Sequence, residues 1–362
     1  MTSLQLVLSI FSFLPFEVCL FWTICFAVQC RKARGPKRYF MAYIFVCTVL
    51  YLCHGLFFTQ GLPYEMECLW TFCSLSVYPL FYGYLCRLTR SDYGVRQLWP
   101  WLMPGLLVAI AKYALPDAGL DHVRLLLFAV QIVTVCYFGI RMLRDFDRKL
   151  HGVYADTDGR DTSDVHNLLI AIIVVSVLSG VANSVGKHYF GESLWLLIPI
   201  SLAFSTMLFA LSYISFWRDF SIDQLRADED DSVAAPFSDK AEDEDYHGEE
   251  TEDVGRQIEA LMTDEHYFLK HDLKISDIVK AVGSNRTHVS GYINSTHGCS
   301  FSDYMNHLRI EYAKQLLLSA QSGRKLRQIA EESGFANEQS FYRNFKKFEG
   351  VTPAEWMSMQ QG

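Results

Sequence analysis

The chain has 362 residues, of which 51% are hydrophobic and 20% are charged, and its formal net charge is −8. A purely soluble protein of this length normally carries about 25% charged residues, so the composition argues against one. The long apolar runs lie within residues 1–217 and most of the charge lies within residues 218–362. This asymmetry predicts at least two domains in two different solvents.

Residues 1–217 contain seven apolar stretches of about the length that crosses a membrane. A hydrocarbon core of about 30 Å requires roughly twenty residues of helix. The stretches are Leu4–Val28, Tyr39–Phe58, Leu69–Cys86, Leu98–Leu115, Val123–Met142, Leu168–Val185 and Leu194–Phe216. The sequence therefore predicts a seven-helix transmembrane bundle.

Basic residues follow the first, third and fifth stretches, whereas the alternate connections are acidic or neutral. Residues 31–38 are the most basic of these connections, and Arg87, Arg90, Arg141 and Arg144 begin the others. Because positively charged loops face the cytoplasm, we expect a multi-pass protein of the cell inner membrane. Its N-terminus lies outside and the residues after 217 lie in the cytoplasm.

Four polar side chains within the predicted spans are candidates for a sensing site for an unknown signal ligand. They are Glu17, His54, Gln131 and Asn183. Polar and ionisable groups are costly in lipid unless they face the interior of the bundle, so such residues often serve function. For Glu17 an alternative is a protonated side chain that joins two helices by a hydrogen bond.

Residues 218–255 form an acidic segment with few aromatic residues. Such a composition cannot bury enough apolar surface to fold, so a disordered, flexible linker is expected. A solvated spacer is the simpler interpretation. Alternatively, its carboxylates compete with DNA phosphates for a basic surface.

Two segments in residues 256–362, offset by about fifty residues, show the pattern of a helix, a turn and a second helix. Gly283 and Gly334 suit the left-handed residue that ends the first helix of each segment. Asn285 and Asn337 suit the N-cap of the second. Ser300 to Asp303 resembles a capping box that begins an amphipathic connecting helix.

The second segment and the residues after it share a series of aromatic, glycine and basic positions. These are Gly334, Phe335, Phe341, Phe345, Lys346, Lys347, Gly350, Thr352 and Pro353. The series resembles the C-terminal signature of the AraC/XylS family of transcription regulators, and residues 308–317 resemble that family's connecting helix. The resemblance covers roughly residues 256–356 and does not reach the apolar half. It implies that the second helix of each segment enters a major groove of double-stranded DNA.

The resemblance also implies which side chains face DNA. Around the first recognition helix these are Arg286, Thr287, His288, Ser290 and Asn294, and on the second they are Glu338, Gln339, Tyr342, Arg343, Asn344, Lys346 and Lys347. Arginine pairs with guanine, glutamine with adenine, and glutamate with cytosine. Phosphate contacts are expected from Arg309, Arg324, Lys325, Arg327, Lys346 and Lys347.

The sequence thus predicts an all-α protein with a seven-span transmembrane domain (1–217), a disordered acidic linker (218–255) and a tandem helix-turn-helix domain (256–362). The predicted function is a membrane-anchored, sequence-specific transcription regulator whose bundle senses a signal. Its expected partners are DNA, the lipid bilayer, the signal ligand and a second copy of the chain, which would form a homodimer on adjacent half-sites.

Two other classes of function compete with this prediction. One is a membrane receptor whose helical cytoplasmic module binds a protein partner instead of DNA. The other is a transporter or intramembrane enzyme. The sequence has no HExxH, no GxSxG and no phosphate-binding glycine loop, so we expect no catalytic residue, cofactor or metal.

Overall fold

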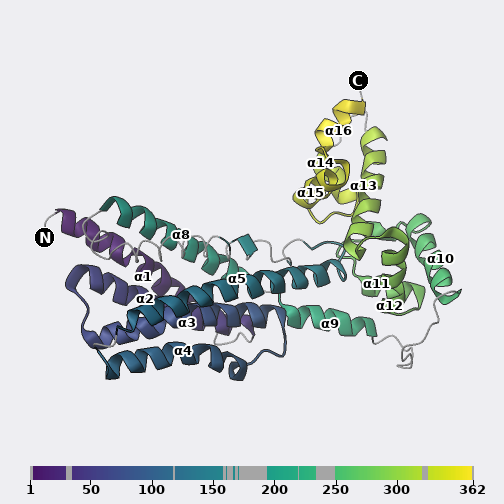
Figure 1. The fold of residues 1–362 in the computed structure, drawn as a ribbon. Coiled ribbons are helices and arrows are strands. Elements are labelled where there is room, and N and C mark those ends of the chain that lie inside the picture. Colours follow the sequence, from purple (N-terminus) through teal and green to yellow (C-terminus); the bar gives the residue numbers. More distant parts are fainter. Residues whose placement is uncertain are drawn as a thin grey trace. The chain divides into compact units, whose positions relative to one another are not determined.

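The computed structural model describes residues 3–29, 35–116, 119–157, 160, 166–167, 170, 194–218, 220–233, 249–319 and 325–360. The regular elements in this part of the chain are helices, and its β-contact is an isolated bridge between Tyr154 and Lys274 (Figure 1). The all-α fold class is therefore confirmed. The chain forms two compact units, which are residues 1–146 with 162–222, and residues 147–161 with 223–362.

The first unit is a bundle of long helices. They are α1 (Ser3–Gln29), α2 (Pro36–Gln60), α3 (Tyr64–Thr89), α4 (Val95–Ala114), α5 (Asp121–His151) and α8 (Leu194–Trp217). Helix α1 packs against α2 and α8, α2 packs against α3, and α3 packs against α4. The last residues of α5, from Asp147 onward, belong to the second unit.

Aromatic rings and small polar side chains fill the interior of this bundle. The ring of Phe216 on α8 lies 5.5 Å from that of Trp22 and 5.4 Å from that of Phe26 on α1. Ser205 and Ser212 of α8 are buried among the helices. Small residues let helices approach closely, which is the usual way that helices associate in lipid.

Four of the seven predicted spans meet the length and composition of a membrane-crossing helix. The segments are Ser9–Gln29, Pro36–Phe57, Asp121–His151 and Ile198–Asp228. Helices α3 and α4 form at the predicted positions but are not among these four. The predicted sixth span, Leu168–Val185, lies almost wholly outside the described residues.

The outer surface of the first unit is apolar. Leu107 on α4, Leu126 and Val133 on α5, and Phe209 on α8 are all exposed. Water solvates such side chains poorly, and soluble monomers rarely expose large apolar patches. A bundle with an aromatic-rich interior and an apolar exterior is suited to a lipid environment.

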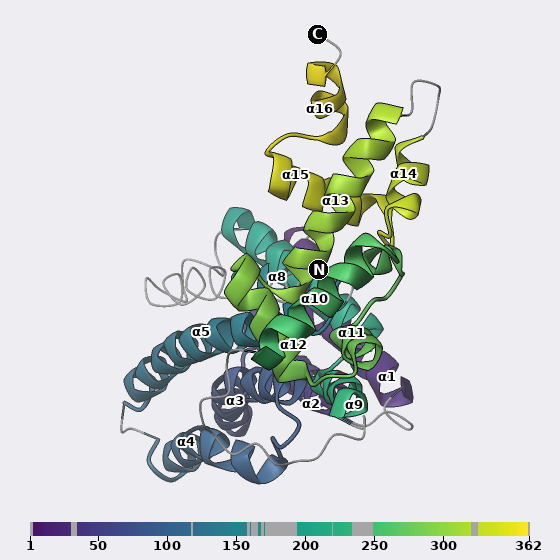
Figure 2. The same cartoon turned by 90° about the vertical axis from the view of Figure 1, so that its right-hand side faces the viewer.

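The second unit contains the C-terminal helices. They are α9 (Ile222–Val233), α10 (Glu249–Thr263), η1 (Tyr267–Leu269), α11 (Ile275–Val282), α12 (Arg286–Tyr292), the π-turn η2 (Ile293–His297), α13 (Phe301–Ser319), α14 (Leu326–Glu332), α15 (Glu338–Glu349) and α16 (Pro353–Gln360). They form two lobes with separate apolar cores, a first lobe of α10–α12 and a second lobe of α14–α16. Helix α13 runs from one lobe to the other (Figure 2). Its Phe301 and Met305 enter the first core, and its Ile310 and Ala313 enter the second.

The structure corrects part of the prediction of a disordered acidic linker. Helix α9 covers residues 222–233, and α10 begins at Glu249. Val254, Ile258 and Met262 are buried at four-residue intervals, so α10 has an apolar stripe beneath its many acids. Residues 234–248 lie outside the described part of the chain.

Candidate nucleic-acid interface

The first helix-turn-helix unit consists of α11 and α12. Gly283 ends α11 with a φ of 67°, in the left-handed region where a side chain would be strained. The Asn285 side chain then accepts a hydrogen bond from the backbone N–H of His288 at 2.9 Å, which caps α12. Val289 and Ile293 face the core. The predicted turn and cap are confirmed.

The second helix-turn-helix unit repeats this arrangement with α14 and α15. Gly334 has a φ of 83°, and the Asn337 side chain accepts from the backbone N–H of Ser340 at 2.8 Å. Phe341 and Phe345 are fully buried. Each Asn satisfies an amide that the first turn of its helix leaves without a partner. Both recognition helices are thus held by the local signals that the sequence contains.

Arg309 joins the two lobes instead of facing DNA. Its side chain is fully buried on α13, where Nε donates to the Phe268 carbonyl at 2.7 Å and Nη2 to the Lys270 carbonyl at 2.9 Å. Its guanidinium carbon lies 5.7 Å from the centre of the Phe335 ring in the second lobe. Burial lowers the pKa of Arg309 to about 10, which leaves it charged at neutral pH. The predicted phosphate contact of Arg309 is therefore wrong.

Residues 152–157, here called the docking loop, belong to the same unit although they follow α5. The Ala155 N–H donates to the Leu273 carbonyl at 2.9 Å, and the Ile275 N–H donates to the Val153 carbonyl at 2.8 Å. The buried Ala155 carbonyl accepts from Ser302 Oγ at 2.8 Å and from Asn306 Nδ2 at 2.9 Å. The loop therefore anchors the start of α13 and completes the first core.

Sequence reasoning placed residues 152–157 in the apolar half and missed the docking loop. A local signal did exist, because Val153, Tyr154 and Ala155 form an apolar run directly after a basic one, and all three are buried. The loop is also tied to α9. The Tyr154 hydroxyl donates to Asp228, and Lys274 Nζ donates to the same carboxylate at 2.8 Å.

The structure leaves most of the predicted DNA-facing positions accessible. On and near α12, Thr287 and Asn294 are exposed, and Arg286, His288 and Ser290 are half-buried. On α15, the exposed residues are Glu338, Gln339, Arg343, Lys346 and Lys347, and Tyr342 is half-buried. Lys325 at the N-cap of α14 and Arg327 within α14 are exposed, and Arg324 lies outside the described residues.

Asn344 is the second correction among these positions. Its side chain is buried, and Nδ2 donates to the Ser340 carbonyl one turn earlier at 3.0 Å. Asn344 therefore stabilises α15 from within and presents no polar edge to a groove. Two of the predicted phosphate contacts carry ion pairs, since Arg327 Nε lies 3.0 Å from Glu331 and Lys347 Nζ contacts Asp303.

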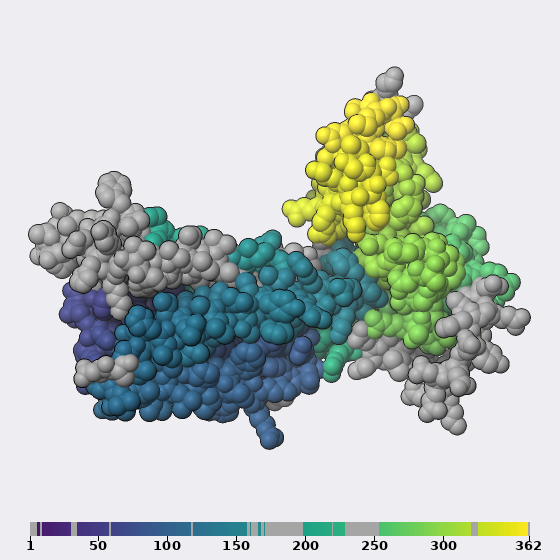
Figure 3. Space-filling model, viewed as in Figure 1, coloured from purple at the N-terminus to yellow at the C-terminus, as the bar shows by residue number. Residues whose placement is uncertain are grey.

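Of the two helices α12 and α15, α15 carries more of the exposed basic charge. Arg343, Lys346 and Lys347 lie within two turns of α15, whereas α12 carries Arg286 and His288. The space-filling view draws the α14–α16 region in yellow (Figure 3). Clustered basic side chains on a helix give the electrostatic footprint of a nucleic-acid surface.

The four polar residues of the predicted spans have different environments. Gln131 Nε2 on α5 donates to the Leu75 carbonyl on α3 at 3.0 Å, which joins two helices. His54 lines a cavity inside the bundle. Glu17 is exposed on α1, so it lies outside the interior of the bundle. Asn183 lies outside the described residues.

Comparison with known proteins agrees with this geometry. Residues 278–359 match a family described as a helix-turn-helix domain. The uncharacterized HTH-type transcriptional regulator YtdP of Bacillus subtilis (strain 168) is 30% identical over 96 residues, which cover 26% of this chain and 12% of that protein. An uncharacterized HTH-type transcriptional regulator of Staphylococcus aureus (strain MSSA476) is 33% identical over 85 residues, or 24% of this chain and 11% of that protein.

The lactose operon transcription activator of Staphylococcus xylosus is 25% identical over 105 residues, which cover 29% of this chain and 36% of that protein. No solved structure matches the chain. The matches thus span about a third or less of each of these relatives, which are named as regulators or activators of transcription, a non-enzymatic class. Residues 278–359 are therefore a helix-turn-helix domain similar to those of these transcription regulators.

Proposed function

We propose that this protein is a membrane-anchored, sequence-specific transcription regulator in which the helical bundle senses a signal and the two helix-turn-helix units read DNA. The apolar exterior of the bundle and its four sufficiently long helices support the membrane anchor. The basic loops after the first, third and fifth predicted spans favour a cytoplasmic second unit. In the inner membrane, seven spans would then place the N-terminus outside.

The accessible face of α15 is the observation that carries the DNA-reading role. Gln339 and Arg343 are exposed one turn apart on this recognition helix, with Lys346 a turn further along. A bidentate arginine or glutamine contact discriminates between bases by about 1–3 kcal/mol. Thr287 and Asn294 offer further hydrogen-bonding groups on and after α12.

The test uses the full chain in lipid nanodiscs and the DNA upstream of its own gene. We expect a footprint with two protected major grooves and an affinity that falls steeply with salt, because phosphate contacts release counterions. Arg343→Ala should weaken binding to the specific site about 5- to 150-fold while nonspecific binding changes little. Arg256→Ala is the matched control, since Arg256 is an exposed arginine on α10.

Other results would favour the competing functions. If the full chain showed no salt-dependent DNA binding, the second unit would be better explained as a module that binds a protein partner. If a reporter fused after residue 362 were found outside the cytoplasm, gene regulation by this chain would be excluded. Crosslinking with and without DNA would show whether a homodimer occupies adjacent half-sites.

A further inference from the structure

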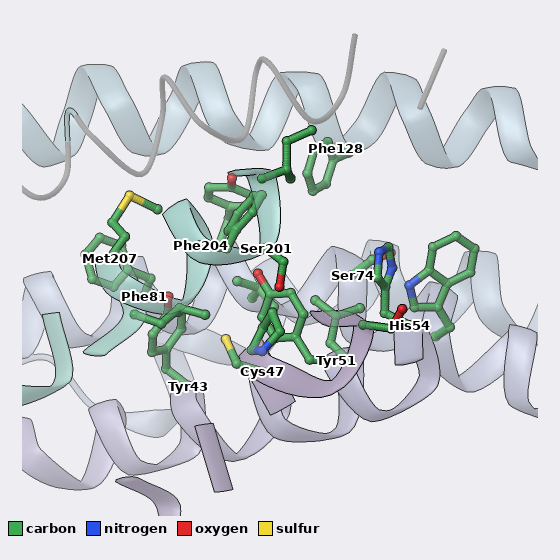
Figure 4. Close-up of a pocket in the computed structure, with 18 of the residues that line it drawn as sticks. Tyr43, Cys47, Tyr51, His54, Ser74, Phe81, Phe128, Ser201, Phe204 and Met207 are labelled. Carbon is green, nitrogen blue, oxygen red and sulfur yellow. The ribbon is translucent and has the colours of Figure 1, made fainter. Parts of the chain in front are cut away.

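The first unit contains a cavity of about 180 Å³ that is lined by α1, α2, α3, α5 and α8. One face of α2 lines it with Tyr43, Cys47, Tyr51 and His54, spaced at one helical turn (Figure 4). The Phe128 ring from α5 and the Phe204 ring from α8 also line it. Lining side chains thus come from helices that lie far apart in the sequence.

The two ends of the cavity differ in chemistry. Figure 4 shows His54 at one end, and Phe81 and Met207 at the other. The ring of Trp70 lies 6.5 Å from the His54 ring, and the Arg124 guanidinium lies 5.0 Å from the centre of the same indole. The His54 end is therefore cationic and aromatic, and the opposite end is aromatic and aliphatic.

Arg124 is well placed to bind an anion at the first of these ends. Its side chain is only 13% exposed and belongs to the cavity lining. Among the described residues, its ion pair with Asp121 runs through Nε at 3.4 Å. The planar guanidinium has further N–H donors, and a guanidinium pairs with a carboxylate through two parallel hydrogen bonds.

Size limits the remainder of the ligand. An apolar cavity of about 150 Å³ accommodates benzene, so about 180 Å³ accommodates one aromatic ring or a short branched chain with a small polar group. Resting on the sensory role proposed above, we propose that this cavity binds a small aromatic or branched-chain monocarboxylic acid. The carboxylate lies at Arg124 and His54, and the apolar body lies among Phe81, Phe128 and Phe204.

The location of the cavity gives such a ligand a route to regulation. Phe128 and Arg124 belong to α5, and the residues that directly follow α5 form the docking loop of the DNA-binding unit. A ligand shifts an equilibrium only when it binds one packing of the helices more tightly than another. A ligand that contacts five helices at once satisfies this condition if their packing changes.

The experiment measures binding of benzoate, phenylacetate and isovalerate to the full chain in nanodiscs, each beside its neutral amide. Thermal stability and tryptophan fluorescence are the readouts, the latter because Trp70 lies at the cationic end. We expect at least one acid to bind with saturation and its amide to bind at least about tenfold more weakly. Arg124→Gln should remove this preference. Arg144→Gln, an exposed arginine further along α5, should not.

A second variant tests the volume of the cavity independently of charge. Met207→Trp places a larger ring at the end of the cavity away from His54, so it should weaken binding of the acid without changing the preference over the amide. The proposal is overturned if none of the acids binds in the millimolar range. It is also overturned if acids and amides bind equally, or if Arg124→Gln retains the preference.

DNA binding of the same preparation separates this proposal from the proposed function. If DNA binding persists and no acid binds, the cavity proposal alone fails. If an acid binds at Arg124 and DNA binding is absent, the gene-regulatory function fails and the ligand site stands.

Discussion

The two helix-turn-helix units share a turn but differ in what surrounds it. A Cβ atom added to Gly283 would meet no atom within 4 Å, whereas one added to Gly334 would lie 2.9 Å from the Leu269 backbone. Leu269 belongs to η1, beside the first lobe, so the second turn is pressed against the neighbouring structure. A glycine with positive φ therefore forms an open turn in the first helix-turn-helix unit and a tightly packed turn in the second.

The recognition helices differ in the same way. Helix α12 has seven residues and continues into the π-turn η2, and α15 has twelve residues and carries most of the accessible basic charge. The docking loop contacts the first core through Ala155. The first helix-turn-helix unit is thus the more embedded of the two, and the second has the longer second helix.

Replacing Arg309 should cause the largest loss of stability, because its side chain contacts both helix-turn-helix lobes. Arg309→Met retains the apolar stem but leaves the Phe268 and Lys270 carbonyls without their donors, and we expect a loss of about 2–5 kcal/mol in the free energy of unfolding. Hydrogen exchange on the full chain should show lower protection in α11 and α15 together. Lys314→Met on the same helix removes partly exposed ion pairs and should cost about 1 kcal/mol or less. If Arg309→Met lowered protection in only one lobe, Arg309 would not connect the two lobes.

Alanine at the two turn glycines should separate the open turn from the crowded one. Gly283→Ala adds left-handed backbone strain, which costs about 1–2 kcal/mol. Gly334→Ala adds the same strain and a backbone clash, for a total of roughly 2–5 kcal/mol. Thermal denaturation of both variants measures the difference. Equal losses would mean that the second turn is not held by the contact with Leu269.

The docking loop should respond to the loss of its two donors. Ser302→Ala combined with Asn306→Ala leaves the buried Ala155 carbonyl without either hydrogen bond, and we expect a loss of about 1–3 kcal/mol. Hydrogen exchange at residues 153–156 should rise more than in α15. Unchanged exchange there would show that the loop is not an integral part of this unit.

The features that sequence reasoning predicted correctly are local ones. Gly283, Asn285 and Asn337 act within one turn of their own position, so residue type and spacing were sufficient. The apolar stretches that form α1, α2, α5 and α8 are likewise read from a single segment.

The errors arose where a side chain's environment is set by distant residues. Arg309 looked like a surface base because its acceptors lie about forty residues earlier in the chain. The docking loop pairs residues 153–155 with residues more than a hundred positions later. Asn344 is the exception, because its partner Ser340 is local and it was assigned to DNA from the family resemblance alone.

The N-caps should give equal effects in the two units. Asn285→Ala and Asn337→Ala both remove the hydrogen bond to a helix amide, and losing this cap bond should cost about 1 kcal/mol in either helix. Denaturation of the two variants in parallel measures both losses of stability. They should be more alike than those of the two glycine variants, because each cap acts within its own helix whereas Gly334 also packs against Leu269. A much larger loss at Asn337 would mean that this cap also has a packing role.

The smallest effect should come from two neighbouring lysines of α15. Lys346 is exposed, whereas Lys347 contacts Asp303 on α13 and must release it to reach a phosphate. Lys346→Ala should therefore lower the slope of log affinity against log salt by about 1, and Lys347→Ala by less. Salt titrations of DNA binding with the two variants measure this difference. If Lys347→Ala changed the salt slope more than Lys346→Ala, the ion pair between Lys347 and Asp303 would have to break when DNA binds. Asp303 would then compete with the DNA phosphates for Lys347.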